Sequence, residues 1–286
     1  PTAKPPEGGT PNIKLATAVL KTSDDENARV RFQCALTLGE LQNPNVIPAL
    51  AKIAERDMKD RWARAAVLSS INGRANDFLN ALLPIAEKIG RDKNSDEELA
   101  LLPLMNELGR VLGAEEANSV ASLRTMISST NAADFDWQLA LLSGFADGLR
   151  NSKRTLISVA KLDSSNSLPR VEAFTQRAAA IASDSAQPTD RRLVAIDLLS
   201  HSTFEKAGSA LETSLNSSQP SEIQIAAVRA LTQMPGTNGG AALVRKEHWN
   251  GYTPAVRESV FTAMMTQPNL IQALLASVER GDISAW

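Results

Sequence analysis

A helical pattern recurs along this chain, and the recurrence limits the possible folds more than any other feature of the sequence. The strings VRFQCALTLGEL, WARAAVLSSI, RRLVAIDLLS, IQIAAVRALTQM and VRESVFTAMM begin at Val30, Trp62, Arg191, Ile223 and Val256, and adjacent copies start 32 or 33 residues apart. Each string opens near an apolar residue, has a small residue one turn later and then keeps a leucine-like position. This period is typical of α-solenoids, because one helical hairpin cannot bury its apolar face alone whereas stacked hairpins share a core.

Helical signals also fill the sequence between these strings. Aromatic residues make up only 4% of the chain, which disfavours a strand-rich fold. We therefore expect about sixteen helices in antiparallel pairs, joined by short loops, and no strand. The expected helices cover residues 28–41, 46–54, 60–71, 77–89, 99–112, 115–127, 134–149, 152–160, 169–182, 189–200, 205–215, 221–233, 241–246, 255–265 and 268–280.

The chain divides into a short linker and one long repeat domain. Residues 1–11 are rich in proline, glycine and threonine and are predicted to be a linker. Residues 12–286 are predicted to form a single HEAT-like domain, most regular at 24–90 and 189–280. The middle, 94–185, matches the repeat poorly, so irregular or longer helices are expected there.

The predicted fold class is an all-α superhelix of the HEAT/armadillo-like kind. HEAT units typically place an aspartate in the turn between their two helices and an arginine shortly into the second helix. Asp25 with Arg31 resembles that arrangement, and Asp60 with Arg64 resembles it more loosely. Such pairs predict a polar ladder between layers, which is a structural role.

The segment DDENARVRFQCALTLGELQNPNVIPALAKIAERDMKDRWARAAVLSSI, from Asp24 to Ile71, resembles the HEAT-repeat segment of the PVC-type haem-binding proteins, also labelled membrane-bound dehydrogenases. LLASVERGDI near the C-terminus carries a weaker likeness. In that family a propeller-like domain precedes the helical array and a cytochrome c domain with a Cys-x-x-Cys-His motif follows it. The resemblance implies a spacer between these modules in an exported or periplasmic bacterial protein, and it is compatible with membrane association of the parent protein.

Composition excludes several kinds of site. Cys34 is the single cysteine, so neither an intrachain disulfide nor a haem attachment motif is present, and a buried, inert thiol is expected. One cysteine with His201 and His248 cannot build a tetrahedral cysteine/histidine zinc site. We expect no cofactor in this chain.

The net charge of −2 and the pI near 5.9 do not indicate nucleic-acid binding. No apolar run reaches the ~20 residues of a membrane helix. The start without methionine and the end at Trp286 lead us to expect part of a longer protein.

Four short motifs could carry chemistry, and each is better explained structurally. Ser200-His201-Ser202 suggests a nucleophile, but adjacent residues on a helix do not face each other, so a polar helix end is favoured. His248 is expected in a surface turn. Asp134 and Asp136 could act as an acid–base pair, yet at a helix start they more simply favour the positive end of its dipole. Residues 235–240 are glycine-rich but lack the Lys-Ser/Thr of a P-loop, so a loop is expected.

Arginines and tryptophans offer possible partner contacts. Four arginines lie near predicted helix starts: Arg61, Arg64, Arg191 and Arg192. They could line a groove for an anionic partner, although solvated or layer-bridging roles are favoured. Trp62 and Trp137 could anchor a partner, although core packing is the default expectation for both.

No catalytic, metal-binding or cofactor-binding residue follows from the sequence. We predict a non-catalytic scaffold that takes part in protein–protein interaction, through other domains of the same protein or an unknown partner. The alternative is a HEAT-like enzyme that processes nucleic acid or modifies a chromophore. The first would need a basic concave groove with an acidic residue at its floor, and the second a pocket that contains Cys34 or His201.

Overall fold

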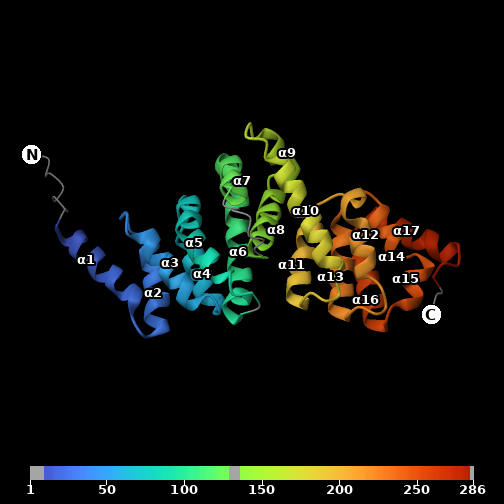
Figure 1. The fold of residues 1–286 in the computed structure, drawn as a ribbon, viewed down its shortest axis with the longest axis horizontal. Helices are drawn as coiled ribbons and strands as arrows, with labels where there is room; N and C mark the ends of the chain where they lie inside the picture. Colours follow the sequence, from blue (N-terminus) through green and yellow to red (C-terminus); the bar gives the residue numbers. More distant parts are fainter. Residues whose placement is uncertain (1–9, 94, 129–135, 284–286) are drawn as a thin grey trace, which may run out of the picture.

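The computed structural model describes residues 10–93, 95–128 and 136–283, and every regular element within these ranges is helical. The elements follow one another along an elongated molecule (Figure 1). Seventeen α-helices and two 3-10 turns lie in this part of the chain, so the all-α prediction is confirmed, and the expected number of about sixteen is close. The first half comprises α1 (Thr10–Lys21), α2 (Ala28–Gly39), α3 (Val46–Asp57), α4 (Arg61–Ser69), α5 (Ala75–Ile89), α6 (Asp96–Ala114), α7 (Ser119–Ser128) and α8 (Asp136–Arg150).

The second half continues in the same manner with shorter connections. It comprises α9 (Leu156–Leu162), α10 (Leu168–Ser183), α11 (Thr189–Leu199), α12 (Phe204–Ser214), α13 (Ser221–Gln233), α14 (Asn238–Leu243), α15 (Lys246–Gly251), α16 (Pro254–Met264) and α17 (Pro268–Glu279). None of the helices in the described ranges is both long enough and apolar enough to cross a bilayer.

Contacts sort most of these helices into two rows. In the first, here called row A, α2 packs on α4, α4 on α6, α6 on α8, α8 on α11, α11 on α13 and α13 on α16. In the second, row B, α3 packs on α5, α7 on α9, α10 on α12, α12 on α14 and α14 on α17. Each helix therefore meets helices that lie near it in the sequence, and one hydrophobic core continues along the molecule (Figure 1).

Several helix starts have side-chain caps. The side chains of Asn27, Asp60, Ser95 and Thr253 accept hydrogen bonds from backbone N–H groups in the first turns of α2, α4, α6 and α16. Gly281, after α17, has φ +73°, the left-handed conformation that suits a glycine stop.

Several predicted boundaries are wrong. The helix α3 does not end before Arg56 but continues to Asp57, whose carboxylate accepts hydrogen bonds from the Arg31 guanidinium of the preceding helix. The helix α1 begins at Thr10, inside the predicted linker 1–11. Residues 115–127 divide into a 3-10 turn and α7, and 241–246 divide between α14 and α15.

Ser221 and Gln224 have the sequence spacing of a capping box, but the Ser221 side chain does not cap α13. Instead the Nε2 group of Gln224 donates to the carbonyls of Leu215 and Asn216, at 3.3 and 2.7 Å. The amide thereby satisfies the end of the preceding helix rather than the start of its own.

This use of a side chain to bond the preceding carbonyls recurs along row A. Each donor lies one or two residues into one of the five similar strings, and each acceptor lies in the segment just before that helix. The bonds run from Arg31 to Asp25 O and Glu26 O, from Arg64 to Met58 O, from Arg192 to Ala182 O, from Gln224 to Leu215 O and Asn216 O, and from Arg257 to Trp249 O. Buried carbonyls at helix ends need such partners. In the predicted pair of Asp25 with Arg31, the Arg31 guanidinium thus donates to the backbone carbonyl of Asp25. The carboxylate that it binds is that of Asp57.

The closest helix pair lies in the middle segment, where the repeat is weakest in sequence. Helix α6 has 19 residues, which agrees with the expectation of longer helices there. Gly109 and Gly113 of α6 face Gly144 and Gly148 of α8, and a Cβ atom added to any of them would come within 2.4 Å of backbone atoms in the opposite helix. Gly109 lies opposite Leu141 and Phe145, and Gly113 opposite Phe145 and Leu149, so the two helices run parallel. We call these four glycines the glycine seam.

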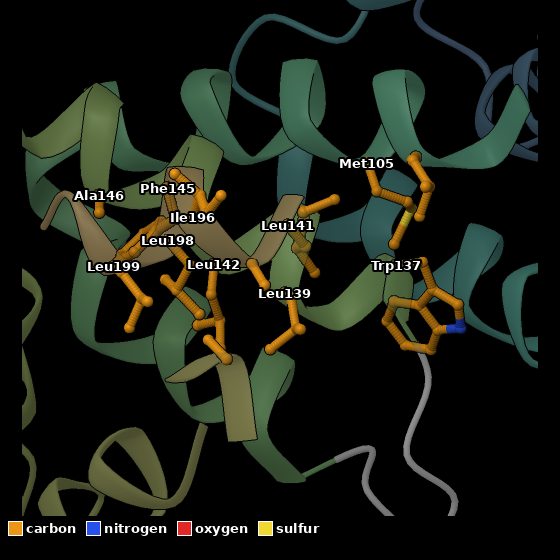
Figure 2. Close-up of a cluster of buried hydrophobic side chains, with 14 of the residues drawn as sticks. Met105, Trp137, Leu139, Leu141, Leu142, Phe145, Ala146, Ile196, Leu198 and Leu199 are labelled. Atoms are coloured by element: carbon orange, nitrogen blue, oxygen red, sulfur yellow. The ribbon is translucent and has the colours of Figure 1, made fainter. Parts of the chain in front are cut away.

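Helix α8 is the most enclosed element of the molecule. All of its residues are buried except Asp147 and Arg150. Figure 2 shows its side chains gathered with Ile196, Leu198 and Leu199 of α11, while Met105 reaches the cluster from α6. A helix that is apolar on nearly all sides belongs in a core. Asp147 and Arg150 are therefore the two residues of α8 that reach the surface.

Candidate binding groove

An open groove of about 750 Å³ lies over the middle of row A, between α6, α8, α11 and α13. Apolar side chains line much of it, among them Leu102 and Pro103 of α6, Leu193 and Val194 of α11, and Ala226 of α13. Its charged lining residues are Glu107, Arg110, Asp147, Asp190, Asp197 and Arg229. A concave surface that is partly apolar and carries a few fixed polar groups is the usual form of a binding site.

Asp147 joins three helices at the edge of this groove. Its carboxylate accepts Arg110 Nη2 of α6 at 3.0 Å and lies 3.6 Å from Arg150 Nη1 of its own helix. Arg150 in turn donates to the Gln233 side-chain oxygen of α13 at 3.2 Å from both Nη1 and Nη2. These contacts extend from α6 to α13, so they fix the spacing of the groove walls.

His201 occupies the centre of the same arrangement, directly after α11. Arg150 Nη2 lies 3.2 Å from His201 Nδ1, and a guanidinium can only donate, so Nδ1 accepts and Nε2 carries the proton. His201 Nε2 lies 3.5 Å from Asp147 Oδ1. Burial, together with the positive charge of Arg150, lowers the pKa of His201 to about 4, so the imidazole is neutral at pH 7.

Asp197 also lines the groove, and it has a different environment. Ser143 Oγ donates to its Oδ2 at 2.6 Å, and Asn106 Nδ2 lies 3.5 Å from the same oxygen. The carboxylate is open to solvent along the groove but is otherwise surrounded by protein, and this desolvation raises its pKa. Among the residues that the structure describes, no lysine or arginine nitrogen lies within 4 Å of this carboxylate.

We call these residues the polar network. It consists of two bonded groups, one of Asn106, Ser143 and Asp197 and the other of Arg110, Asp147, Arg150, His201 and Gln233. The glycine seam positions it, because the close approach of α6 and α8 lets Asn106 of α6 reach Asp197 of α11 past Ser143 of α8. Sequence reasoning missed the network. The available signal was the pair of strings GRVLG and GFADG, in which glycines four residues apart mark a close helix contact.

The predicted motif Ser200-His201-Ser202 does not form a nucleophile and base. Ser200 is the C-cap residue of α11, as expected for a polar helix end. It lines the groove, and its buried hydroxyl has no hydrogen-bond partner within the described ranges. His201 borders a separate hollow of about 10 Å³, the room of about one water molecule.

Asp136 has a larger role than the expected dipole interaction at the start of α8. Its buried carboxylate pairs with Arg177 of α10 at 3.1 Å and with Arg191 of α11. Asp134 lies outside the described residues, so the predicted pair is not described. Arg191 thus bridges helices, as favoured from the sequence.

The other predicted arginines do not line the groove. Arg64 bridges layers by donating to both carboxylate oxygens of Glu107 at 2.9 Å. Arg192 is buried and donates to the Ala182 carbonyl, so a solvated role is wrong for it. Arg61 is exposed and stacks on Trp62, with its guanidinium carbon 4.7 Å from the ring centroid.

The two tryptophans differ from each other. Trp137 is fully buried, as expected, whereas Trp62 is 62% exposed, so core packing is wrong for Trp62. Trp62 is exposed because it lies outside the buried face of α4, which consists of Ala63, Ala66 and Val67.

The remaining candidates have structural roles. Cys34 is buried, its Sγ lies 3.3 Å from the Val19 carbonyl oxygen, and burial raises the pKa of its thiol. His248 is half-buried in the short helix α15 rather than in a turn. The glycine-rich stretch 235–240 is a loop only in its first part, because α14 begins at Asn238 and Gly239 packs against the Leu231 backbone.

Within the described ranges, no three side chains of His, Cys, Asp or Glu gather in a way that could hold a metal ion. The chain matches no model of a known protein family, and no curated protein sequence is similar enough to count as a match.

Proposed function

We propose that the chain is a HEAT-like α-solenoid segment that acts as a non-catalytic scaffold and binds a polypeptide segment in the groove. The solenoid assignment is supported by the position of the five similar strings, which fall in α2, α4, α11, α13 and α16, all members of row A. It is also supported by the repeated side-chain bond to the preceding carbonyls, because equivalent residues have equivalent roles.

The groove is the observation that carries the binding proposal. A volume of about 750 Å³ that is open to solvent suits a chain segment lying across several helices. Its polar groups are held in place before any ligand arrives, since Asp147, Arg150 and Gln233 bond to one another across α8 and α13. Preorganised groups lose less conformational entropy on binding, which favours affinity.

An enzymatic role has less support. A nucleic-acid-processing groove needs clustered positive charge, but this lining has four carboxylates against two guanidinium groups. A chromophore-modifying enzyme would need a pocket at His201 or Cys34, and the hollows beside these two residues do not favour one. The one at His201 is about 10 Å³, and the one at Cys34 is a shallow depression of about 300 Å³.

The spacer role rests on the resemblance of Asp24–Ile71 alone. A rigid row of helices is suited to holding two modules at a fixed separation, and it would act through length rather than through the groove. Deleting residues 12–286 from a longer parent protein and measuring haem content and electron transfer tests this role. Loss of electron transfer with the haem content retained supports the spacer role, whereas unchanged electron transfer contradicts that role.

Selection of peptides from a random display library tests the groove. The whole chain is immobilised, and selected peptides are measured again on Ala226→Trp, which fills the groove, and on Ser209→Trp, which adds the same bulk to the exposed face of α12. We expect the selected peptides to lose binding on Ala226→Trp and to keep it on Ser209→Trp. Peptides that bind both variants equally would show that the groove is not the docking surface.

A further inference from the structure

We infer that the groove recognises a basic segment, with one lysine or arginine side chain on Asp197 and a second on Asp190. This inference rests on the proposed function, because it specifies the chemistry of the partner that the groove would bind. It follows from the charged residues of the groove that have no ion-pair partner among the described residues of the protein.

Three of the six charged residues that line the groove already have ion-pair partners. Arg110 pairs with Asp147, and Glu107 receives both hydrogen bonds of the Arg64 guanidinium. Asp197 has only the neutral donors Ser143 and Asn106. Asp190 is exposed and has no ion pair within the described ranges. The unpaired carboxylates therefore both belong to α11.

Arg229 of α13 is the remaining charged residue of the lining. It is exposed, has no ion pair in the described part of the chain and lies 32 residues after Asp197, at the same place in the next repeat string. The groove thus has an acidic side on α11 and a basic side on α13. A basic segment would lie over α11, with Arg229 left to meet an acidic or carbonyl group of the same segment.

The geometry of α11 defines the spacing of the two cations. Asp190 and Asp197 are seven residues apart, which is two helical turns or about 10.5 Å along the axis on one face. Leu193 and Val194 lie between them in the groove lining. A polyproline II segment advances about 9 Å in three residues and returns to the same face. Basic residues three apart, with an apolar residue between them, would therefore match this surface.

A cation at Asp197 would offset an existing energetic penalty. The carboxylate is partly desolvated, which raises its pKa, and Arg110 and Arg150 act on it only from a distance. A ligand ammonium group in direct contact would stabilise the ionised form, as charge-assisted hydrogen bonds are stronger than neutral ones. Ser200 lines the groove one turn later, and its hydroxyl has no partner within the described residues.

Fluorescence anisotropy with a labelled nine-residue peptide tests the inference on the whole chain. The peptide has two lysines three residues apart, separated by leucine and proline, and its comparison peptides replace both lysines with glutamine or glutamate. The protein variants are Asp197→Asn, Asp190→Asn and, as the charge-matched control, Glu279→Gln at the end of α17. The amide introduced by Asp197→Asn would keep an oxygen for the Ser143 hydroxyl to bond, so the fold should persist, and circular dichroism checks this.

We expect the lysine peptide to bind at least about tenfold more tightly than the glutamine peptide. Asp197→Asn should remove most of that difference, and Glu279→Gln should leave it unchanged. Equal binding of the lysine and glutamine peptides, or equal effects of Asp197→Asn and Glu279→Gln, would overturn the inference. Displayed peptides that need the groove but are acidic or neutral would also overturn it while leaving the proposed scaffold function intact.

Discussion

The carbonyl oxygen of Asn106 in α6 lies where a side chain on Gly144 of α8 would have to be, since only 1.9 Å would separate it from a Cβ atom. The same two helices repeat this contact at Gly109, Gly113 and Gly148. Backbone lies against backbone here, so the obstacle cannot be removed by turning a side chain. The polar network depends on this closeness, because Asn106 reaches Asp197 past α8.

Gly144→Ala should therefore lower the free energy of unfolding by about 3 kcal/mol, the upper end of the usual range for overpacking. Urea denaturation measures the effect as a lower midpoint at unchanged slope. Gly251→Ala is the control, because its nearest neighbour would be the Ser217 Cβ atom at 3.1 Å, in an exposed connection. A loss below about 1 kcal/mol for Gly144→Ala would mean that α6 and α8 separate easily, contrary to the seam.

A second prediction concerns the buried ion pair of Arg31 and Asp57, whose side chains are 5% and 11% exposed. Arg31→Leu would leave the Asp57 carboxylate buried without its partner, and would remove the donor that Arg31 supplies to the Glu26 carbonyl. We expect a loss of about 3 kcal/mol in unfolding free energy, as for other broken buried pairs.

The comparison for Arg31→Leu is Lys52→Met, which removes an exposed pair from the same hairpin. Lys52 and Asp24 lie 3.4 Å apart and are 61% and 67% exposed. Exposed pairs contribute about 0–1 kcal/mol, so the effect should be small. Thermal or urea unfolding that gave similar losses for the two variants would contradict the structural importance assigned to Arg31.

The repeat strings predicted the helical class and five helices that belong to row A, α2, α4, α11, α13 and α16, because apolar spacing reflects which face a helix buries. They did not predict the groove, since its polar network joins residues from four helices. Asn106 and Asp197, for example, lie 91 residues apart. Such contacts follow from how closely helices pack, and local periodicity carries no information about that distance.

Local sequence patterns also failed to predict two contacts at helix ends. Asp57 remains helical because Arg31 of another helix holds its carboxylate, so a tertiary contact overrides the local break signal. Ser221 and Gln224 have the spacing of a capping box, yet Gln224 bonds to the preceding helix instead. In both cases a nearby carbonyl or guanidinium competes with the local partner that the sequence suggests.

The contrast between Trp62 and Trp137 gives a third prediction. Trp137→Ala should lower the free energy of unfolding by about 3–5 kcal/mol, because it empties a fully enclosed site. Trp62→Ala should change it by less than about 0.5 kcal/mol, since that ring is 62% exposed and contacts Arg61. Acrylamide should quench the fluorescence that is lost in Trp62→Ala more readily than the fluorescence that is lost in Trp137→Ala. A strongly destabilised Trp62→Ala variant would mean that this ring packs against the fold after all.

His201 makes stability depend on pH in a defined direction. The pKa of its imidazole is lowered to about 4 in the folded protein by burial and by Arg150, against about 6.5 when unfolded. The unfolded chain therefore takes up a proton first as the pH falls. The contribution of neutral His201 is complete above about pH 6.5 and is lost as the pH drops towards 4.

Wild-type protein should lose about 2 kcal/mol of unfolding free energy between pH 7 and pH 5 relative to His201→Asn. Asparagine keeps an acceptor for Arg150 but has no titrating group, so the difference between the two proteins isolates the imidazole. His248→Asn, which changes the other histidine of the chain on α15, is the matched control variant. Urea unfolding at half-unit pH steps gives the comparison. Parallel curves for wild type and His201→Asn would mean that His201 is not held neutral between Arg150 and Asp147.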